Sequence, residues 1–364
     1  MEPRDRGAPF RPPGRPPFAP LPDHDRLVSV LVRTRDRPTL LPRALASILA
    51  QDTPPAEVVI ANDGGDPAPV EAAAEAFAGS GIAVVLRHAP RPEGRFAAAA
   101  AAHAASSGPL LALLDDDDSW EPGFLAATLA RFRAPDAACL AAVHSWWRTI
   151  EERPDGDGRM ETLSGNVVRI GRPPYTSLAR LLQPANIQPQ AVLIRREALE
   201  RAGGWDPALK VGGDWEFHLR LAAEGEIGVV PRPLANWHLR RSVAPGTSPL
   251  ANATSAAADY DAFHTAYWNR QVRAMLHAGP EMAATALLLG QIRHGQASQM
   301  QRVQAGQAAI LARLERIEAL LAAPDAGASV LARLETIERL LGAAATPGDP
   351  DLRPAPGGAS MRDD

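Results

Sequence analysis

The sequence contains few of the residues that cross-link a chain or give it a strong net charge. Cys139 is the single cysteine, which excludes an internal disulfide framework and a multi-cysteine zinc site. Lys210 is the single lysine among 38 basic residues, and 42 acidic residues bring the formal charge to −4. This balance provides no chain-wide positive field, so we expect no nucleic-acid partner.

Long hydrophobic runs are also missing. No apolar stretch reaches the roughly 18 to 20 residues of a membrane-spanning helix, and the first residues lack the apolar segment of a signal peptide. We therefore expect a cytoplasmic protein, either free or peripheral at the inner membrane face. With 46% hydrophobic and 22% charged residues, the composition is close to the globular average and excludes wholesale disorder.

Composition changes along the chain divide it into five parts. Prolines crowd the first 26 residues, whereas the last part of the chain is rich in alanine, glycine and proline. We expect the following domains: a disordered proline-rich tail at 1–26, a catalytic α/β domain at 27–240, a helical extension at 241–300, short coiled-coil-like repeats at 301–342 and a disordered tail at 343–364.

Short apolar runs alternate with helical patterns in the first half of the chain. Expected strands lie at 27–32, 57–61, 82–86, 110–114, 138–145 and 190–194. Expected helices lie at 39–50, 70–77, 96–105, 196–202 and 214–223. Alternation of this kind predicts an α/β fold with a mostly parallel sheet, because a parallel pair needs a crossover connection. Residues 154–166 are rich in glycine and aspartate and predict an irregular excursion.

A short repeat occurs near the end of the chain. Residues 331–341 repeat residues 311–321 at an offset of 20, and each copy has the apolar spacing of a coiled-coil seam. The copies are short for a free coiled coil. They leave two interpretations open: helices that fold back on the domain, or a homo-oligomer or partner contact through these heptads.

Four consecutive aspartates, Asp115 to Asp118, follow the apolar run at 110–114. In doubly wound sheets, ligands bind at the carboxyl ends of the strands, so this loop lies where a ligand is expected. Adjacent carboxylates repel one another, and a divalent cation would relieve that repulsion. Oxygen-only ligands suit hard cations, so we expect Mn²⁺ or Mg²⁺ here.

Five motifs follow one another along the chain. They are Val28-Ser-Val-Leu-Val-Arg-Thr-Arg-Asp-Arg-Pro38, Glu57-Val-Val-Ile-Ala-Asn-Asp-Gly-Gly65, Leu114-Asp-Asp-Asp-Asp-Ser-Trp-Glu-Pro122, Arg195-Arg-Glu-Ala-Leu-Glu-Arg-Ala-Gly-Gly-Trp-Asp206 with Gly213-Asp-Trp-Glu216, and the segment from Pro231 to His238. In this order they resemble the family 2 glycosyltransferases, which are inverting enzymes of the GT-A fold. The resemblance covers about residues 27–240 and implies a sheet of mostly parallel strands flanked by helices.

The resemblance implies a metal-dependent transfer of a sugar from a UDP-, GDP- or dTDP-sugar to a glycan or lipid-linked acceptor. It implies donor contacts by Thr34, Asp36, Asp63, Asp115 and Asp116. Arg95, beside an expected helix N-terminus, joins them as a candidate for the diphosphate. The implied metal ligands are Asp117, Asp118 and His238, and the implied acceptor residues are Gly203, Gly204 and Trp205.

Asp214 matches the acid that acts as general base in the family. Several of these residues also have an ordinary structural interpretation. Asp214 is placed to cap a helix, Asp63 to form a turn, Trp205 to pack in a core and His238 to fill a structural position. The sequence positions of Asp115 to Asp118 do not decide which two of these aspartates are metal ligands.

The sequence departs from the family pattern at four places. Asn62 replaces a common aspartate, Arg35 a common aromatic residue, Gly213 a common glutamate, and alanines at 97–102 a common asparagine. These departures affect donor identity more than reaction class. Two alternatives remain: a catalytically degenerate scaffold, and a nucleotidyltransferase, although residues 33–38 lack the glycine- and lysine-rich phosphate loop of that class.

Overall fold

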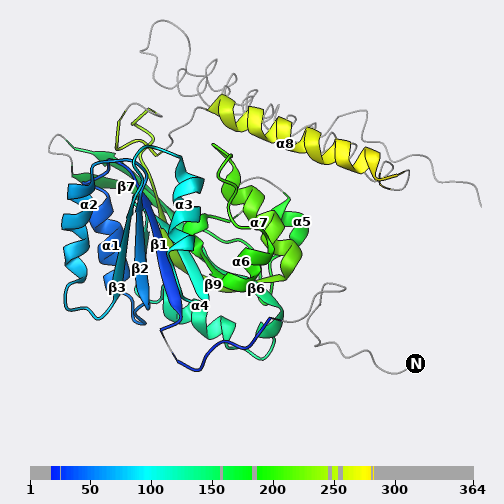
Figure 1. Cartoon of the computed structure of the whole chain (residues 1–364), viewed down its shortest axis with the longest axis horizontal. Coiled ribbons are helices and arrows are strands. Elements are labelled where there is room, and N and C mark those ends of the chain that lie inside the picture. The colour runs from blue at the N-terminus through cyan, green and yellow to red at the C-terminus, as the bar shows by residue number, and fades with distance from the viewer. Residues whose placement is uncertain are drawn as a thin grey trace, which may run out of the picture. The chain divides into compact units, whose positions relative to one another are not determined.

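The computed structural model describes residues 18–24, 26–155, 159–182, 187–244, 248–252, 257–279 and 282 (Figure 1). Its strands are β1 Val28–Thr34, β2 Glu57–Asn62, β3 Ala83–His88, β4 Leu110–Asp115, β5 Ser119–Trp120, β6 Leu140–Pro154, β7 Met160–Val168, β8 Val192–Arg195 and β9 Glu226–Leu239. Its α-helices are α1 Leu41–Leu49, α2 Pro67–Ala74, α3 Arg95–Ala104, α4 Phe124–Phe132, α5 Leu178–Leu181, α6 Arg196–Arg201, α7 Gly213–Glu224 and α8 Ala257–His277. Short 3₁₀ helices lie at Glu75–Phe77, Ala137–Cys139 and Pro189–Ala191.

One mixed sheet organises the domain. Its strand order is β3-β2-β1-β4-β8-β6-β9-β5, with β7 added to β6. The first four strands in this order run parallel, whereas β8 is antiparallel to both β4 and β6. This arrangement confirms the predicted α/β class and the mostly parallel sheet flanked by helices that is typical of GT-A enzymes.

Alternating side chains of the parallel strands enter two separate cores. In β1, Val30 and Val32 belong to the core on the side of α1 and α4, whereas Leu31 belongs to the core on the side of α3, α6 and α7. All seven residues of β1 are buried. A strand covered on both faces reads as a continuous apolar run, which explains why this element is visible in the sequence.

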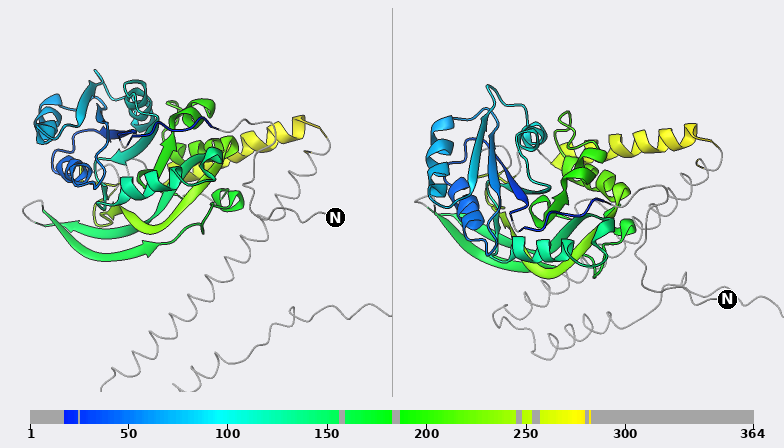
Figure 2. Two further views of the ribbon diagram at one scale, coloured as in Figure 1. Left: turned by 90° about the horizontal axis from the view of Figure 1, so that it is seen from below. Right: turned by 60° about the horizontal axis from the view of Figure 1, so that its bottom comes forward.

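The second half of the sheet is built from long, curved strands. β6 pairs in parallel with β9 and antiparallel with β7, and the ribbon curls around one side of the domain (Figure 2). Residues 154–166 were expected to be irregular, but β7 occupies most of them. Its side chains are largely exposed, so the strand lacks an apolar pattern and is held by backbone hydrogen bonds to β6.

Residues 18–24 lie against the domain, unlike the solvated tail expected up to residue 26. Phe18 is buried, and its N–H donates to the carbonyl of Ala138 at 2.9 Å. The guanidinium groups of Arg195 and Arg201 lie 5.1 and 4.8 Å from the centre of its ring. The Phe18 ring therefore holds this segment on the domain. Each cation–π contact stabilises it by about 0.5–2 kcal/mol in addition to the burial of the ring.

The chain divides into two units, residues 1–267 and 268–364. Helix α8 begins in the first unit, and of the second unit the structure describes the end of this helix and a few residues beyond it. The repeats expected at 301–342, the tail at 343–364 and most of the extension at 241–300 lie outside the described residues. Within the described part, no helix has the length and hydrophobicity needed to cross a bilayer.

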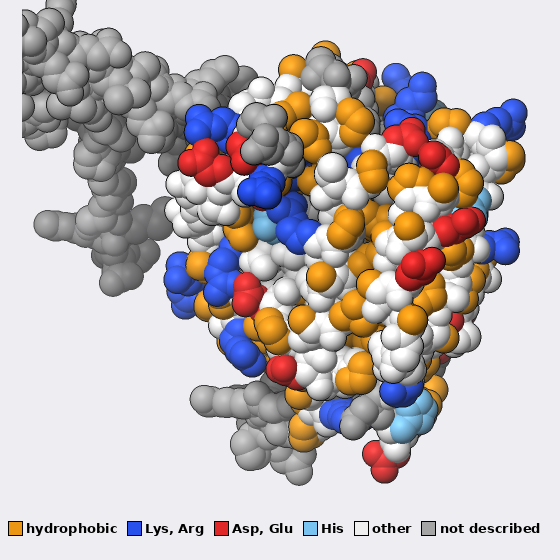
Figure 3. All heavy atoms as spheres, turned by 90° about the vertical axis from the view of Figure 1, so that its left-hand side faces the viewer, with side chains coloured by type: hydrophobic (Ala, Val, Ile, Leu, Met, Phe, Trp, Pro, Cys, Tyr) orange, Lys and Arg blue, Asp and Glu red, His pale blue; other side chains and the backbone are white. Residues whose placement is uncertain are grey.

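The side of the domain that carries α2 and β3 shows no concentration of one charge. In Figure 3, acidic and basic side chains lie scattered around a middle where hydrophobic and uncharged side chains mix. Such a face has interspersed charges of both signs, as is usual for a soluble domain surface.

The start of α7 is packed between two aromatic rings. A Cβ added to Gly212 would come within 2.1 Å of the Phe263 ring of α8, and one added to Gly213 would come within 2.7 Å of Phe96 of α3. The Trp215 ring lies 5.0 Å from that of Tyr267. Glycine is therefore required at two successive positions for α7 to begin where it does.

We predict that Gly212→Ala destabilises the domain by more than a positive φ alone would. Gly212 has φ +70°, and Gly79 has φ +75° with no atom within 4 Å of its added Cβ. Gly79→Ala should therefore cost about 1–2 kcal/mol, and Gly212→Ala about 1–3 kcal/mol more because Phe263 must move. Urea unfolding measures both values. Equal losses in the two variants would contradict this packing argument.

Two buried histidines predict a loss of stability in acid. Burial lowers the pKa of His144 and of His218 to about 4. Below the ordinary pKa of about 6.5, the unfolded chain binds protons more readily than the folded chain does. The free energy of unfolding therefore falls between pH 6.5 and pH 4, by about 2 kcal/mol per histidine at pH 5.

The variant that tests this is His144→Gln, compared with the unaltered protein by urea unfolding at pH 7 and pH 5. The difference in unfolding free energy between the two pH values should be smaller in the variant by about 2 kcal/mol. An identical pH dependence in both proteins would show that His144 is not neutral in the folded state.

Candidate active site

A cavity of about 510 Å³ opens at the carboxyl ends of β1, β2 and β4. This is the edge of the sheet at which the sequence predicts a ligand. Residues from the loops after these strands meet there with the start of α3 and a segment that follows β9. The lining residues are Arg33 to Arg37, Asp63, Gly94, Arg95, Ala98, Asp115 to Asp117, Ser248, Pro249, Ala251 and Asn252.

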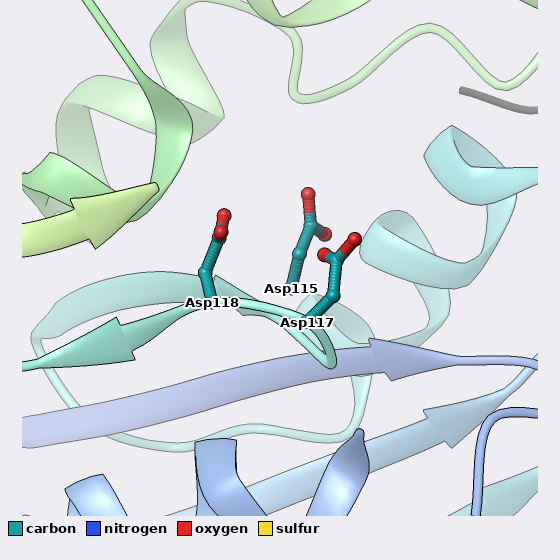
Figure 4. A group of neighbouring side chains, drawn as sticks. All are labelled: Asp115, Asp117 and Asp118. Carbon is teal, nitrogen blue, oxygen red and sulfur yellow. The ribbon is translucent and has the colours of Figure 1, made fainter. Parts of the chain in front are cut away.

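Three of the four consecutive aspartates converge at the turn between β4 and β5. Carboxylate oxygens of Asp115, Asp117 and Asp118 lie within 4.8 Å of one another, and the side chains rise from the turn toward the same side (Figure 4). Asp117 and Asp118 are buried, and Asp115 is partly buried. An all-oxygen group of this kind fits Mg²⁺ or Mn²⁺.

Asp116 does not belong to this group of three carboxylates. Its carboxylate accepts hydrogen bonds from Thr34 Oγ1 at 2.7 Å and Arg37 Nη1 at 2.9 Å. Burial raises the pKa of Asp116 to about 6, with a further increase from the Asp117 charge and opposition from Arg37. The hydroxyl of Thr34 therefore binds the Asp116 carboxylate and orients it.

Arginines balance part of this negative charge. Arg37 and Arg240 both approach the Asp117 carboxylate, and Arg43 donates to the Asp117 carbonyl oxygen at 2.7 Å. Among the described residues, no arginine forms a salt bridge with the Asp118 side chain, although the charge of Arg240 acts on it. Burial, together with the charges of Asp117 and Asp115, raises its pKa well above the ordinary value.

Glu152 of β6 connects the arginines with His238. Its carboxylate accepts hydrogen bonds from Arg43 and Arg240 and lies 3.1 Å from Nδ1 of His238. Burial alone would raise the pKa of Glu152, but hydrogen bonds from His238 and Arg43 outweigh it and lower the pKa to about 2. Glu152 is therefore a negative charge held between positive groups.

His238 is the expected metal ligand that the structure does not bring to the three carboxylates. Its Nδ1 faces Glu152, and its Nε2 lies 2.9 Å from Ser119 Oγ. The backbone N–H of His238, and not its ring, donates to Asp118 at 3.0 Å. In this arrangement both ring nitrogens are occupied, and the residue orients Asp118 through its main chain.

Asp214, in the first turn of α7, is not among the residues that line the cavity, but it contacts Arg33, which is. Its Oδ2 lies 3.3 Å from Nη2 of Arg33, and the same guanidinium binds the Asp115 carboxylate through Nε at 2.5 Å and Nη2 at 3.1 Å. Register explains the second contact, because Arg33 of β1 lies opposite Asp115 of β4 in the sheet. One arginine therefore joins the acidic turn to the candidate base.

Asp63 holds the loop that leads into α3. Its carboxylate accepts the N–H of Glu93 at 2.6 Å and of Gly94 at 3.0 Å. Arg95 follows at the first position of α3 and lines the cavity. Asp63 is therefore a link between the end of β2 and the helix start that carries Arg95.

Asp36 lies in the turn after β1 with φ 52°, an unusual conformation for a residue other than glycine. Its Oδ1 accepts the N–H of Asp66 at 3.2 Å, so the turn after β1 is tied to the loop after β2. A second cavity of about 330 Å³ shares Asp63 and Ala98 with the first. Alanines of α3 form one wall of this second cavity, which widens the space beside Asp63.

The expected acceptor residues lie outside the cavity lining. Trp205 is buried and packs on Phe217 with ring centres 5.0 Å apart, so its ring is not open to a sugar in this structure. Gly203 and Gly204 adopt positive φ angles and return hydrogen bonds to Glu200 and Leu199 at the end of α6. These glycines terminate a helix, as is usual for this conformation.

Several site residues escaped the sequence analysis. Arg33 and Arg37 belong to a quoted motif but had no assigned role, and Glu152 stands in a strand whose pattern is otherwise mixed. Asn252, which lies after β9, donates to the carbonyl of His238 at 2.5 Å. Arg33 could have been singled out because it is a charged residue at the end of an otherwise apolar strand. Residues 248–252 carry no motif that would identify Asn252.

We predict that Asp118→Asn separates stability from metal binding. The change removes one repelled negative charge, and the asparagine oxygen can still accept the His238 N–H. The metal-free variant should be as stable as the unaltered protein or more stable by about 1 kcal/mol, a rise of a few degrees in Tm.

Addition of Mn²⁺ should raise the Tm of the unaltered protein, and this rise should become smaller in the variant because one of three converging carboxylates is lost. Thermal denaturation in EDTA and in Mn²⁺ measures both effects. A lower Tm in EDTA together with an undiminished Mn²⁺ effect would contradict the prediction.

Comparison with solved structures gives low sequence identities. S. aureus TarS 1–349 in complex with UDP-GlcNAc is 16% identical, with a TM-score of 0.47 and coverage of 59% of each chain. The mannosyltransferase PcManGT from Pyrobaculum calidifontis, in complex with GDP-Man and Mn²⁺, is 20% identical, with a TM-score of 0.46 and coverage of 64% of this chain and 60% of that one. The chain thus spans about three fifths of these proteins.

A search of curated proteins found no match. The model of the family described as Glycosyl transferase family 2 matches residues 29–203. This range begins in β1 and includes the second strand, the acidic turn and helix α6, so it contains most of the cavity lining. Residues 29–203 of the chain are therefore similar to the family described as Glycosyl transferase family 2.

Proposed function

We propose that this enzyme transfers a sugar from a nucleotide-sugar donor to an acceptor hydroxyl in one inverting, metal-dependent displacement. The observation that carries the proposal is the Arg33 guanidinium, which contacts both Asp115 and Asp214. A candidate base and an acidic, cation-compatible turn thus share one site. A displacement reaction needs both: a group that accepts the proton and a group that supports the leaving diphosphate.

Asp115, Asp117 and Asp118 are the residues that would hold Mn²⁺ or Mg²⁺. Their oxygen-only composition and their mutual distances within 4.8 Å fit a hard cation. When bound, such a cation neutralises negative charge on the departing nucleoside diphosphate. Asp116 supports the turn from the side, through its hydrogen bonds with Thr34 and Arg37.

The donor nucleotide occupies the cavity between the ends of β1 and β2 in this proposal. Asp36 and Asp63 shape its walls, because each accepts backbone N–H groups from a neighbouring loop. Arg95 meets the diphosphate from the start of α3, where the helix N-terminus favours negative charge. The wider space beside Asp63 accommodates the base or ribose of the donor.

Asp214 accepts the proton of the acceptor hydroxyl. Its Oδ2 is held by Arg33, whereas Oδ1 is buried and has no hydrogen-bond partner in the described part of the chain. A free lone pair on a held carboxylate is what a general base requires. Direct attack of the deprotonated oxygen at the anomeric carbon, opposite the departing diphosphate, inverts the configuration there. The acceptor is a glycan or a lipid-linked sugar.

We predict that Asp214→Asn lowers turnover by about 10²- to 10⁴-fold and changes donor affinity little. The amide keeps an oxygen for Arg33 but cannot take a proton. The measurement is Mn²⁺-dependent hydrolysis of UDP-, GDP- and dTDP-sugars, with water in place of the acceptor, together with donor binding by calorimetry. Asp52→Asn, on an exposed turn after α1, is the control and should retain full turnover.

The possible outcomes separate the alternatives. Unchanged turnover in Asp214→Asn would remove the assigned base. Failure of the unaltered protein to bind any nucleoside diphosphate with Mn²⁺ would favour a catalytically degenerate scaffold. Release of pyrophosphate from a nucleoside triphosphate and a sugar phosphate would instead identify a nucleotidyltransferase.

A further inference from the structure

Arg33 contacts two carboxylates with one guanidinium group, and the resemblance leaves this residue without a role. It is the sixth residue of β1, and its side chain is 5% exposed. Its guanidinium contacts the Asp115 carboxylate of β4 in two places and the Asp214 carboxylate of α7 in one. A planar guanidinium can bridge two carboxylates in this way, whereas the compact ammonium of lysine cannot.

Packing holds the guanidinium of Arg33 in place. It lies over the Phe96 ring of α3, with 5.6 Å between its central carbon and the ring centre. Phe96 is itself buried and lies so close to Gly213 that an added Cβ would come within 2.7 Å of the ring. The same ring therefore supports Arg33 and the residue that precedes Asp214.

Charge also fixes this contact. The Arg33 side chain is 5% exposed, and carboxylate oxygens of Asp115 and Asp214 lie within 3.3 Å of its guanidinium. The guanidinium is therefore permanently charged. Removal of either carboxylate would leave this buried positive charge with fewer compensating groups.

Two polar atoms of this ion pair are left over. Arg33 Nη1 and Asp214 Oδ1 are both buried and have no hydrogen-bond partner among the described residues. A buried polar atom without a partner is energetically unfavourable, and a bound molecule could remove that cost. By their chemistry, Oδ1 can accept a hydroxyl proton and Nη1 can donate to an oxygen atom.

We propose that Arg33 is a positioning residue that holds Asp214 by Oδ2 and ties this base to Asp115 of the donor site. The inference rests on the proposed function, in which Asp214 is the base. It explains why the base on α7 keeps a fixed position relative to the donor site, which is built from β1 and β4.

The test is a double-mutant cycle between Arg33→Lys and Asp214→Asn. The measured quantities are the kcat of Mn²⁺-dependent hydrolysis, with the donor sugar that the unaltered protein hydrolyses fastest, and the affinity for that donor by calorimetry. Arg33→Lys alone should lower kcat by about 10²-fold. It should lower donor affinity by less than about tenfold, because the other arginines that line the cavity remain.

In the Asp214→Asn background, Arg33→Lys should change kcat by less than about threefold, since a residue that acts through the base has nothing left to position. Equal factors in both backgrounds would overturn the proposal and show that Arg33 acts on the donor directly. Thermal denaturation checks that each variant is folded. If Arg33→Lys does not fold, the cycle is repeated with Arg33→Gln.

Arg220→Lys is the matched control. Arg220 also pairs with a carboxylate of α7, Glu216, at 2.7 Å, but it lies outside the cavity lining. Its kcat should stay within about twofold of the unaltered value. If the unaltered protein hydrolyses no donor, both proposals fall. If Asp214→Asn lowers kcat as predicted but the cycle is additive, only the proposed role of Arg33 is refuted.

Discussion

The site depends on one buried ion pair between elements that are far apart in the chain. Arg33 at the end of β1 contacts Asp115 at the end of the neighbouring β4 and Asp214 at the start of α7. The sheet provides the first contact, because parallel strands in register bring their carboxyl ends to one edge. Helix α7 provides the second, because Phe96 and Phe263 hold its first turn. Without this pair, the acidic turn and the candidate base would have no direct connection.

Charge is the other constraint on the site. Asp115, Asp117 and Asp118 converge in a largely buried turn, and arginines from β1, the following loop, α1 and the end of β9 approach them. These contacts leave Asp118 with a strongly raised pKa, so its environment favours a neutral or a cation-bound state. Repulsion among carboxylates normally destabilises a fold, and its persistence here is consistent with a binding role.

Residues beyond the matched range complete the domain. Asn252 contacts the main chain of His238, and Phe263 packs on Gly212 beside Asp214. Both residues follow β9, which itself lies outside residues 29–203. The part of the chain after the last strand is therefore more than a linker in this protein. It forms one wall of the cavity and fixes the helix that carries the candidate base.

The sequence by itself determined the parallel strands, the acidic turn and the fold class. These features arise locally, since strands buried on both faces need continuous apolar runs and four adjacent aspartates are visible without any fold. Only the tertiary structure decided that Trp205 is core, that the His238 ring faces Glu152 and Ser119, and that Arg33 spans two acids. Such contacts depend on strand register and helix placement over long sequence separations, and residue type alone does not encode which neighbour a side chain meets.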